Sequence, residues 1–289
     1  MCAQRRLHFL LAGHAEPTST VSDWYVAPGH TGVGLGQALV RQGDESSTFM
    51  YTSAISESAA VGFGRLGWIG DRRFPMFTGL VPLALSLAGR RSAGVHIEHR
   101  VVSADETGDL SPIDQIWDHL RWPAAAMMVR DAAYLRRHLR LAGGRRYSLL
   151  VAYRHEIPIG YLLHRILPRH SIGALGRIRV GLIADYLVDE ADVAALRDLV
   201  GEACREWSAK RVRVFMALSA AERHRATFSK LGLLRPVTVG GRLLGSRMSN
   251  RTMYQPKPGT EGSWHLTFAD NDTDLILGST QSCHPDGLS

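Results

Sequence analysis

The sequence predicts an α/β fold made of two similar mixed-sheet units in tandem, the first of them shortened on its N-terminal side. Three observations predict this fold. Strand-like and helix-like stretches alternate along most of the 289 residues, which is the pattern of α/β proteins. A set of residue types recurs in the same order in both halves. A glycine-rich turn separates a strand from a helix in the first half and has no counterpart in the second.

Apolar runs and glycines place the elements of the first half. Gly67 ends its second helix, because glycine readily adopts the left-handed conformation of a helix C-cap. The stretch 79–94 carries Pro82 and ends in Gly, Arg and Ser, so we expect a break there. The expected elements are strands at 6–12 and 18–28, a helix at 35–45, a strand at 47–53, a helix at 56–67 and an extended stretch at 68–79.

The second half begins with a strand and contains the clearest helix pattern of the chain, at 189–210. Its acidic first turn suits the positive end of the helix dipole. Ser111 is expected to be an N-cap, with Pro112 at the first helical position. The expected elements are a strand at 95–102, helices at 111–122 and 130–141, a hairpin at 146–166, a strand at 176–188, helices at 189–210 and 220–232, and strands at 212–219 and 263–270.

These elements predict the domain organisation. Residues 1–94 form a partial unit with the glycine turn, 95–275 form a complete unit without one, and 276–289 form a flexible tail. The second unit has a strand and two helices in 95–145 for which the first unit has no equivalent. Either the first unit is truncated, or another element covers that flank.

The repeat is the strongest evidence for two copies of one unit. The spacing from the aspartate to the final glycine is 44 residues in the first copy and 47 in the second. The copies differ at one place, since the first has Gly32, Gly34 and Gly36 where the second has an acidic run. The matched pairs are Asp23/Asp185, Tyr25 or Trp24 with Tyr186, Val26/Val188, Phe49/Phe215, Met50/Met216, Phe63/Phe228, Leu66/Leu231 and Gly67/Gly232.

The glycine turn is a candidate cradle for an anion. A helix N-terminus presents unpaired N–H groups, and glycines let an anion approach the backbone closely. The spacing fits neither a Walker A loop, which needs Gly-Lys-Ser/Thr, nor the G-x-G-x-x-G of dinucleotide-binding folds. A plain tight turn explains the glycines nearly as well, so the pattern alone leaves both interpretations open.

Composition narrows the choice of partners. The net charge of +7 and the pI of about 9.7 favour an anionic partner, either nucleic acid or a phosphate-bearing cofactor. The arginines are scattered, so a solvated basic surface is favoured and nucleic-acid binding is not expected. No apolar run approaches the roughly 20 residues that span a bilayer, and the N-terminus does not have the pattern of a secretory signal. We expect a cytoplasmic protein without membrane contact.

The cysteines give no sign of a metal site or a disulfide framework. Cys2, Cys204 and Cys283 lie far apart and form no CxxC pair. Cys204 falls within a helix pattern and is expected to be a buried, inert thiol. No metal ligands are predicted elsewhere in the chain.

At the glycine turn the sequence resembles a known family. The run "VAPGHTGVGLGQAL" is similar to the signature of the GNAT acetyltransferase superfamily, a strand followed by Arg/Gln-x-x-Gly-x-Gly/Ala at a helix start. Gly34 and Gly36 fall on its two small positions, whereas Thr31 stands where the family has Arg or Gln. "FGRLGW" and "FSKLGL" resemble the family's later aromatic-x-x-x-Gly element. "SWHLTFADNDTDL" resembles the ending of tandem GNAT-like proteins, some linked to bacterial polysaccharide synthesis.

The resemblance implies a function. It implies two GNAT-like units and direct transfer of an acyl group from acetyl-CoA, as co-substrate, to an amine or hydroxyl of a small molecule or sugar. The pyrophosphate would lie on the turn amides and the pantetheine arm along the preceding strand. The implied cofactor-binding residues are Trp24, Tyr25, Val26, Gly32, Val33, Gly34, Leu35, Gly36 and Gln37.

The catalytic machinery is incomplete by comparison with the family. The tyrosine that acts as the acid in many members is replaced by Phe63, and by Phe228 in the second copy. Asp23 is the candidate base, although its repetition as Asp185 equally suggests a structural role. The alternative is therefore a degenerate acetyltransferase-like protein that binds CoA or a partner without catalysis. The second copy is not expected to bind CoA, because its turn carries Asp189, Glu190 and Asp192. Whether the chain forms a homodimer is left open.

Overall fold

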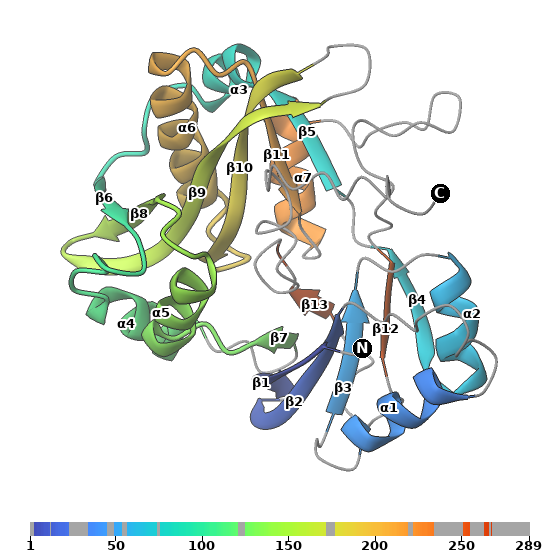
Figure 1. Cartoon of the computed structure of the whole chain (residues 1–289). Coiled ribbons are helices and arrows are strands. Elements are labelled where there is room, and N and C mark those ends of the chain that lie inside the picture. Colours follow the sequence, from blue (N-terminus) through green and yellow to red (C-terminus); the bar gives the residue numbers. More distant parts are fainter. Residues whose placement is uncertain are drawn as a thin grey trace.

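The structure is a computed structural model of the whole chain (Figure 1). The description covers residues 3–11, 13–22, 34–44, 49–53, 57–73, 76–120, 125–171, 177–218, 222–233, 251–254, 263–265 and 267. Within these residues the chain forms two mixed β-sheets with helices packed against them, so the predicted α/β class with two mixed-sheet units is confirmed.

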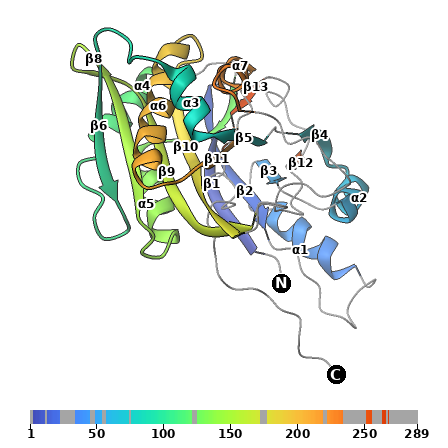
Figure 2. The same cartoon turned by 90° about the horizontal axis from the view of Figure 1, so that it is seen from above.

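The first sheet is built around the N-terminal hairpin. Its strands lie in the order β13-β7-β1-β2-β3-β12-β4, and β2 pairs with β3 in parallel. Helices α1 and α2 cover the face that points away from the second half, as Figure 2 shows. The elements are β1 (Ala3–Leu11), β2 (His14–Ser22), α1 (Leu35–Asp44), β3 (Phe49–Ser53), α2 (Glu57–Arg65), β4 (Ile69–Arg73), β7 (Ala125–Met128), β12 (Arg251–Tyr254) and β13 (Ser263–His265).

The second sheet has the order β5-β11-β10-β9-β8-β6. Strand β10 pairs in parallel with β11 only over Val180–Leu182, and then continues to Val188 without that neighbour. The elements are β5 (Met76–Leu80), α3 (Val81–Ala88), β6 (Val95–Val102), α4 (Ser111–His119), α5 (Ala132–Leu141), β8 (Tyr147–Arg154), β9 (Ile157–Ser171), β10 (Arg177–Val188), α6 (Val193–Ala209), β11 (Val214–Leu218) and α7 (Glu222–Lys230).

The two halves exchange strands. Strand β5 belongs to the first half of the chain but pairs with β11 of the second sheet. Strand β12 belongs to the second half but lies between β3 and β4 of the first sheet. Strand β7 pairs with the outer edge of β1, so an element from later in the chain covers the flank at which the first unit is short. The boundary expected near residue 94 stays a prediction. Each sheet nevertheless contains strands from both sides of this residue.

Two expectations about local structure are wrong. Residues 81–88 form helix α3 rather than a break, because Pro82 stands in the first turn, where a missing N–H costs nothing. Ser111 is the first residue of α4 and not its N-cap, which is Leu110. The side chain of Asp109, one residue earlier, accepts hydrogen bonds from the Ser111 N–H and Oγ–H, each at 2.9 Å.

The core between the sheets is aromatic on one side and aliphatic on the other. Phe9, Phe49 and Tyr51 of the first sheet are fully buried and pack against Val180, Leu182, Val214 and Met216 of the second. On β3 the side chains alternate, so Met50 faces α1 and α2 instead. This shared core joins the two sheets, and α6 covers the opposite face of the second one.

The predicted repeat is visible in three dimensions. Gly67 and Gly232 have φ angles of 80° and 74°, both in the left-handed region. The residue after each glycine donates its N–H to the carbonyl of the matched phenylalanine, Phe63 in one copy and Phe228 in the other, at 3.1 Å and 3.0 Å. Both helices therefore end in the same Schellman-type motif, which glycine makes accessible.

Candidate functional site

The glycine turn leads into helix α1. Gly34 has a φ of 79°, which favours glycine, and its carbonyl accepts the first helical hydrogen bond, from Ala38, at 3.0 Å. It is thus the N-cap residue, and the N–H groups of Leu35, Gly36 and Gln37 have no acceptor within the helix. The first turn of α1 contains no acidic residue. These amides form a site suited to an anion.

The structure describes only part of the predicted cofactor site. Gly34, Leu35, Gly36 and Gln37 are brought together at the start of α1. Asp23, Trp24, Tyr25, Val26, Gly32 and Val33 lie outside the described residues, so their roles stay predictions.

The matching turn of the second unit has its amides occupied by its own carboxylates. Asp192 is the N-cap of α6 and accepts a hydrogen bond from the Ala195 N–H at 3.1 Å. Asp189 accepts one from the Ala191 N–H at 2.7 Å. A phosphate approaching this turn would meet two carboxylates in place of free amides, which opposes binding through both charge and lost donors.

A C-terminal segment fills the opening beside β10 in the second unit. His265, fully buried at the end of β13, donates from Nε2 to the carbonyl of Tyr186 at 2.9 Å, and the two rings lie edge to face at 5.0 Å. Burial lowers the pKa of His265 well below its ordinary range, and the charge of Arg130 adds to this effect. Tyr186 matches the strand residues that the resemblance assigns to pantetheine, so the chain itself occupies that position in the second unit.

Asp185 is the centre of a buried polar cluster. Its carboxylate accepts hydrogen bonds from Tyr161 Oη and Thr267 Oγ1, each at 2.7 Å, and pairs with Arg130 at 3.1 Å. Asp185 and Arg130 are both fully buried. The structure therefore gives Asp185 a structural role. An aspartate inside a mainly apolar strand was the only sequence signal for this cluster. Its partners had none, because they come from β9, from the connection between β7 and α5, and from Thr267 near the C-terminus.

The family's tyrosine position is part of the core in both copies. Phe63 is 1% exposed and its ring lies 4.6 Å from that of Trp68. Phe228 is fully buried and its ring lies 5.5 Å from that of Phe77. Neither side chain can transfer a proton, so a catalytic acid, if the reaction needs one, comes from elsewhere.

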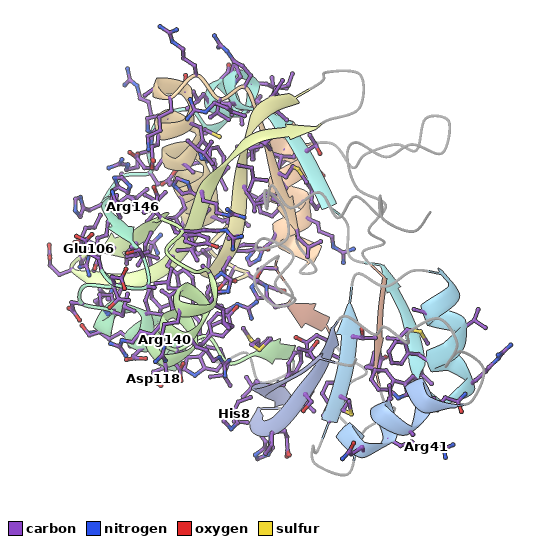
Figure 3. All side chains as sticks on the ribbon, in the orientation of Figure 1. His8, Arg41, Glu106, Asp118, Arg140 and Arg146 are labelled. Carbon is purple, nitrogen blue, oxygen red and sulfur yellow. The ribbon has the colours of Figure 1, made fainter. Side chains whose placement is uncertain are left out.

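Among the described residues no three His, Cys, Asp or Glu side chains are grouped to hold a metal ion. Burial raises the pKa of the Cys204 thiol to about 12, which confirms the expected inert cysteine. Arg41, Arg140 and Arg146 are exposed at separate places on the surface (Figure 3). None of the described helices is long and apolar enough to cross a bilayer.

Comparison with solved structures identifies the fold. A GCN5-related N-acetyltransferase from Anabaena variabilis aligns with a TM-score of 0.59 at 12% identity, over 88% of this chain and 58% of that one. The fold is that of the GNAT acyltransferases. Saccharomyces cerevisiae N-myristoyltransferase with bound myristoyl-CoA gives a TM-score of 0.51 at 11% identity, over 89% and 64%.

A tandem GNAT protein from the clavulanic acid biosynthesis pathway matches over more of its own length. Its TM-score is 0.50 at 14% identity, over 89% of this chain and 84% of that one. The chain spans less than two thirds of the length of the Anabaena and yeast structures. No protein-family model and no curated protein sequence matches this chain significantly. The GNAT likeness is thus one of fold, and at these identities it does not define a substrate.

Proposed function

We propose that this protein is an acyl-CoA-dependent N- or O-acyltransferase that binds acetyl-CoA on the first unit only. The observation that carries the proposal is the start of α1, where Gly34 at positive φ precedes a helix turn without acidic residues. In a GNAT fold such a turn supplies amides and a positive dipole end for a pyrophosphate. The acceptor in this proposal is a small molecule with an amine or hydroxyl group.

The second unit serves as support in this proposal. Its turn is occupied by Asp189 and Asp192, and the carbonyl of Tyr186 is bonded to His265. The two aspartates and His265 all belong to the chain itself. The aspartates accept hydrogen bonds from amides of the turn, and these amides are then not available to a phosphate. The contrast between the two turns therefore supports a single cofactor site per chain.

A non-catalytic CoA-binding protein is the second candidate. The burial of Phe63 in the core favours it, because the residue that matches the family's acid cannot act as one. Catalysis without a tyrosine remains chemically reasonable, because a thiol with a pKa of about 8.5 is a good leaving group near neutral pH. Release of free CoA from acetyl-CoA in the presence of a panel of amines and alcohols separates the two candidates.

The cofactor assignment is tested by Gly36→Asp. Aspartate in the first turn of a helix favours the dipole, so the fold should keep its stability, while the new charge repels the pyrophosphate. At an acetyl-CoA concentration of 100 times Kd the parent should gain about 2.7 kcal/mol of stability. We expect a thermal-shift measurement to show this gain for the parent and its loss in Gly36→Asp.

Gly64→Asp is the matched control. Gly64 is exposed in α2 and has open space around its Cα, so the same substitution adds the same charge away from the turn. The control should keep the acetyl-CoA shift. An equal shift in the parent and both variants would overturn the placement of the cofactor at α1.

A further inference from the structure

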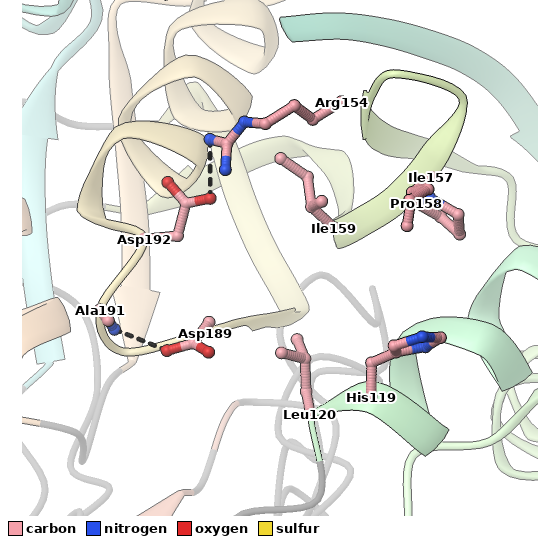
Figure 4. Close-up of a pocket in the computed structure, with 9 residues that line it drawn as sticks. All are labelled: His119, Leu120, Arg154, Ile157, Pro158, Ile159, Asp189, Ala191 and Asp192. Atoms are coloured by element: carbon pink, nitrogen blue, oxygen red, sulfur yellow. Dashed lines mark hydrogen bonds and ion pairs between the residues drawn. The ribbon is translucent and has the colours of Figure 1, made fainter.

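A cavity lies at the end of β10, beside the turn into α6. Its volume is about 450 Å³, within the range of small-molecule sites. As Figure 4 shows, its walls come from three places: the end of α4, the hairpin between β8 and β9, and the turn at residues 189–192. The corresponding place in the first unit is the predicted pyrophosphate cradle, yet the groups here have the opposite charge.

One side of the cavity is apolar. Leu120, Ile157, Pro158 and Ile159 line it. Ile157 is 54% exposed, although it is a large aliphatic side chain at the rim of a concave surface. An apolar ligand body that filled the cavity would cover these side chains and remove apolar surface from water.

The polar side of the cavity offers acceptors. Both oxygens of Asp192 are engaged, one by the Ala195 N–H and the other by Arg154 Nη2 at 2.9 Å. Asp189 uses Oδ1 for the Ala191 N–H, and its other oxygen points toward Leu120 (Figure 4). Within the described part of the chain no hydrogen bond to that second oxygen is found. His119 and Arg154 also line the cavity, and His119 donates from Nδ1 to the Gln115 carbonyl at 2.7 Å. Among the carboxylate oxygens of the site, the second oxygen of Asp189 is therefore the acceptor left for a ligand.

The ion pairing of Asp189 and Asp192 leads to the same conclusion as their hydrogen bonds. Arg154 neutralises Asp192 through their ion pair, and among the described residues Asp189 forms no ion pair with a lysine or arginine. His224 interacts with Asp189, but burial lowers the pKa of this histidine to about 4, so it carries no charge at pH 7. The hydrogen bond of Asp189 to Ala191 is to a neutral amide. A ligand that satisfies this oxygen must donate hydrogen bonds, and a positive charge on the donor strengthens the bond.

We propose that this cavity binds a small organic monocation, an alkylammonium group carried on an apolar body. The ammonium donates to the Asp189 carboxylate, and the hydrocarbon part packs against Leu120 and the isoleucines of the hairpin. The same end of the fold then recognises an anion in the first unit and a cation in the second. This inference does not depend on the proposed acyltransferase activity.

The test uses cyclohexylammonium as the probe and cyclohexanol as its uncharged counterpart of similar shape. Isothermal titration calorimetry or ligand-observed NMR on the full chain at pH 7 should show saturable binding of cyclohexylammonium. Loss of the charge-assisted bond in cyclohexanol should weaken binding about tenfold or more. Equal affinity for both, or no saturable binding of the amine, would overturn the proposal.

Two variants locate the probe. Asp189→Asn removes the charge but keeps an oxygen for the Ala191 N–H, and it should lower affinity about tenfold without changing the melting temperature. Ala191→Phe fills the cavity without changing charge and should also abolish binding. Glu156→Gln, on the exposed hairpin tip outside the cavity, is the matched control and should bind as the parent does. Full binding in Asp189→Asn and Ala191→Phe would place the probe elsewhere.

Discussion

At the scale of single residues, the burial and pairing of a charged side chain show whether a residue that recurs in both copies is structural. Asp185 is matched by Asp23 in the first copy, and the chain surrounds Asp185 with Arg130, Tyr161 and Thr267. A carboxylate that is fully buried and bonded to three side chains of the same protein is out of reach of a substrate. Sequence alone could not show this, because the partners come from distant parts of the chain.

Asp185→Asn is expected to destabilise the protein strongly. The substitution leaves the buried Arg130 guanidinium without its counter-charge, which costs about 3–5 kcal/mol. Urea unfolding followed by circular dichroism measures the loss. Asp105→Asn, at an exposed position, should change stability by less than about 0.5 kcal/mol. A well-folded Asp185→Asn with parental stability would show that the cluster does not stabilise the fold.

The carboxylate of Glu206 on α6 should make stability depend on pH. Burial alone would raise the pKa of Glu206, but contacts with His164, Lys210 and Ser148 outweigh burial and hold the pKa well below its ordinary value of 4.5. His99 lies 3.3 Å from the same carboxylate. A lowered carboxyl pKa adds stability above the unfolded value, and this stability disappears as the pH falls toward the folded value.

Glu206→Gln isolates this contribution. At pH 7 the variant should be less stable than the parent by about 2 kcal/mol, since it loses hydrogen bonds to a charged group. The difference should shrink as the pH falls below about 4.3, where the unfolded glutamate takes up its proton. Denaturant titrations of both proteins between pH 3 and 7 give the two curves. A constant difference across this range would contradict the assigned charge interactions.

At the scale of helices and strands, local pattern predicted most elements but not their partners. The hairpin β8–β9, helix α6 and the glycine-terminated helices α2 and α7 follow from periodicity and turn residues. Helix α3 does not follow from pattern, because a proline within an apolar run indicates a break, whereas Pro82 occupies the first helical turn. The short strands β7 and β12 have few residues and weak alternation, so only pairing with distant strands defines them.

The two turns that lead into α1 and α6 show how the residue type just before a helix affects what the first turn of that helix can bind. Gly34, with positive φ, precedes α1 and brings no side chain to cap its first amides, whereas the Asp192 side chain caps α6. The sequence indicates this difference, because capping preference depends on residue type within a few positions. What the amides of α1 bind stays a prediction. The sequence could not predict the cavity beside α6, whose walls come from three segments that are far apart in the sequence.

At the scale of the whole molecule, the exchange of β5 and β12 joins the two units into one structure. Each sheet contains a strand from the other half of the chain, and the core between the sheets includes residues from both. The second unit therefore supports the first, and the carbonyl of its own Tyr186 is bonded to His265. This division of roles is the central claim of the account: one unit holds the cofactor and the other completes the fold.

Calorimetric titration of the full chain with acetyl-CoA tests that claim most directly, because it counts sites and measures affinity together. The account predicts a single acetyl-CoA per chain in the parent and no measurable heat of binding in a folded Gly36→Asp variant. Asp192→Asn, which changes only the turn of the second unit, should keep the parental stoichiometry and affinity. Two sites in the parent, or full binding in Gly36→Asp, would contradict it.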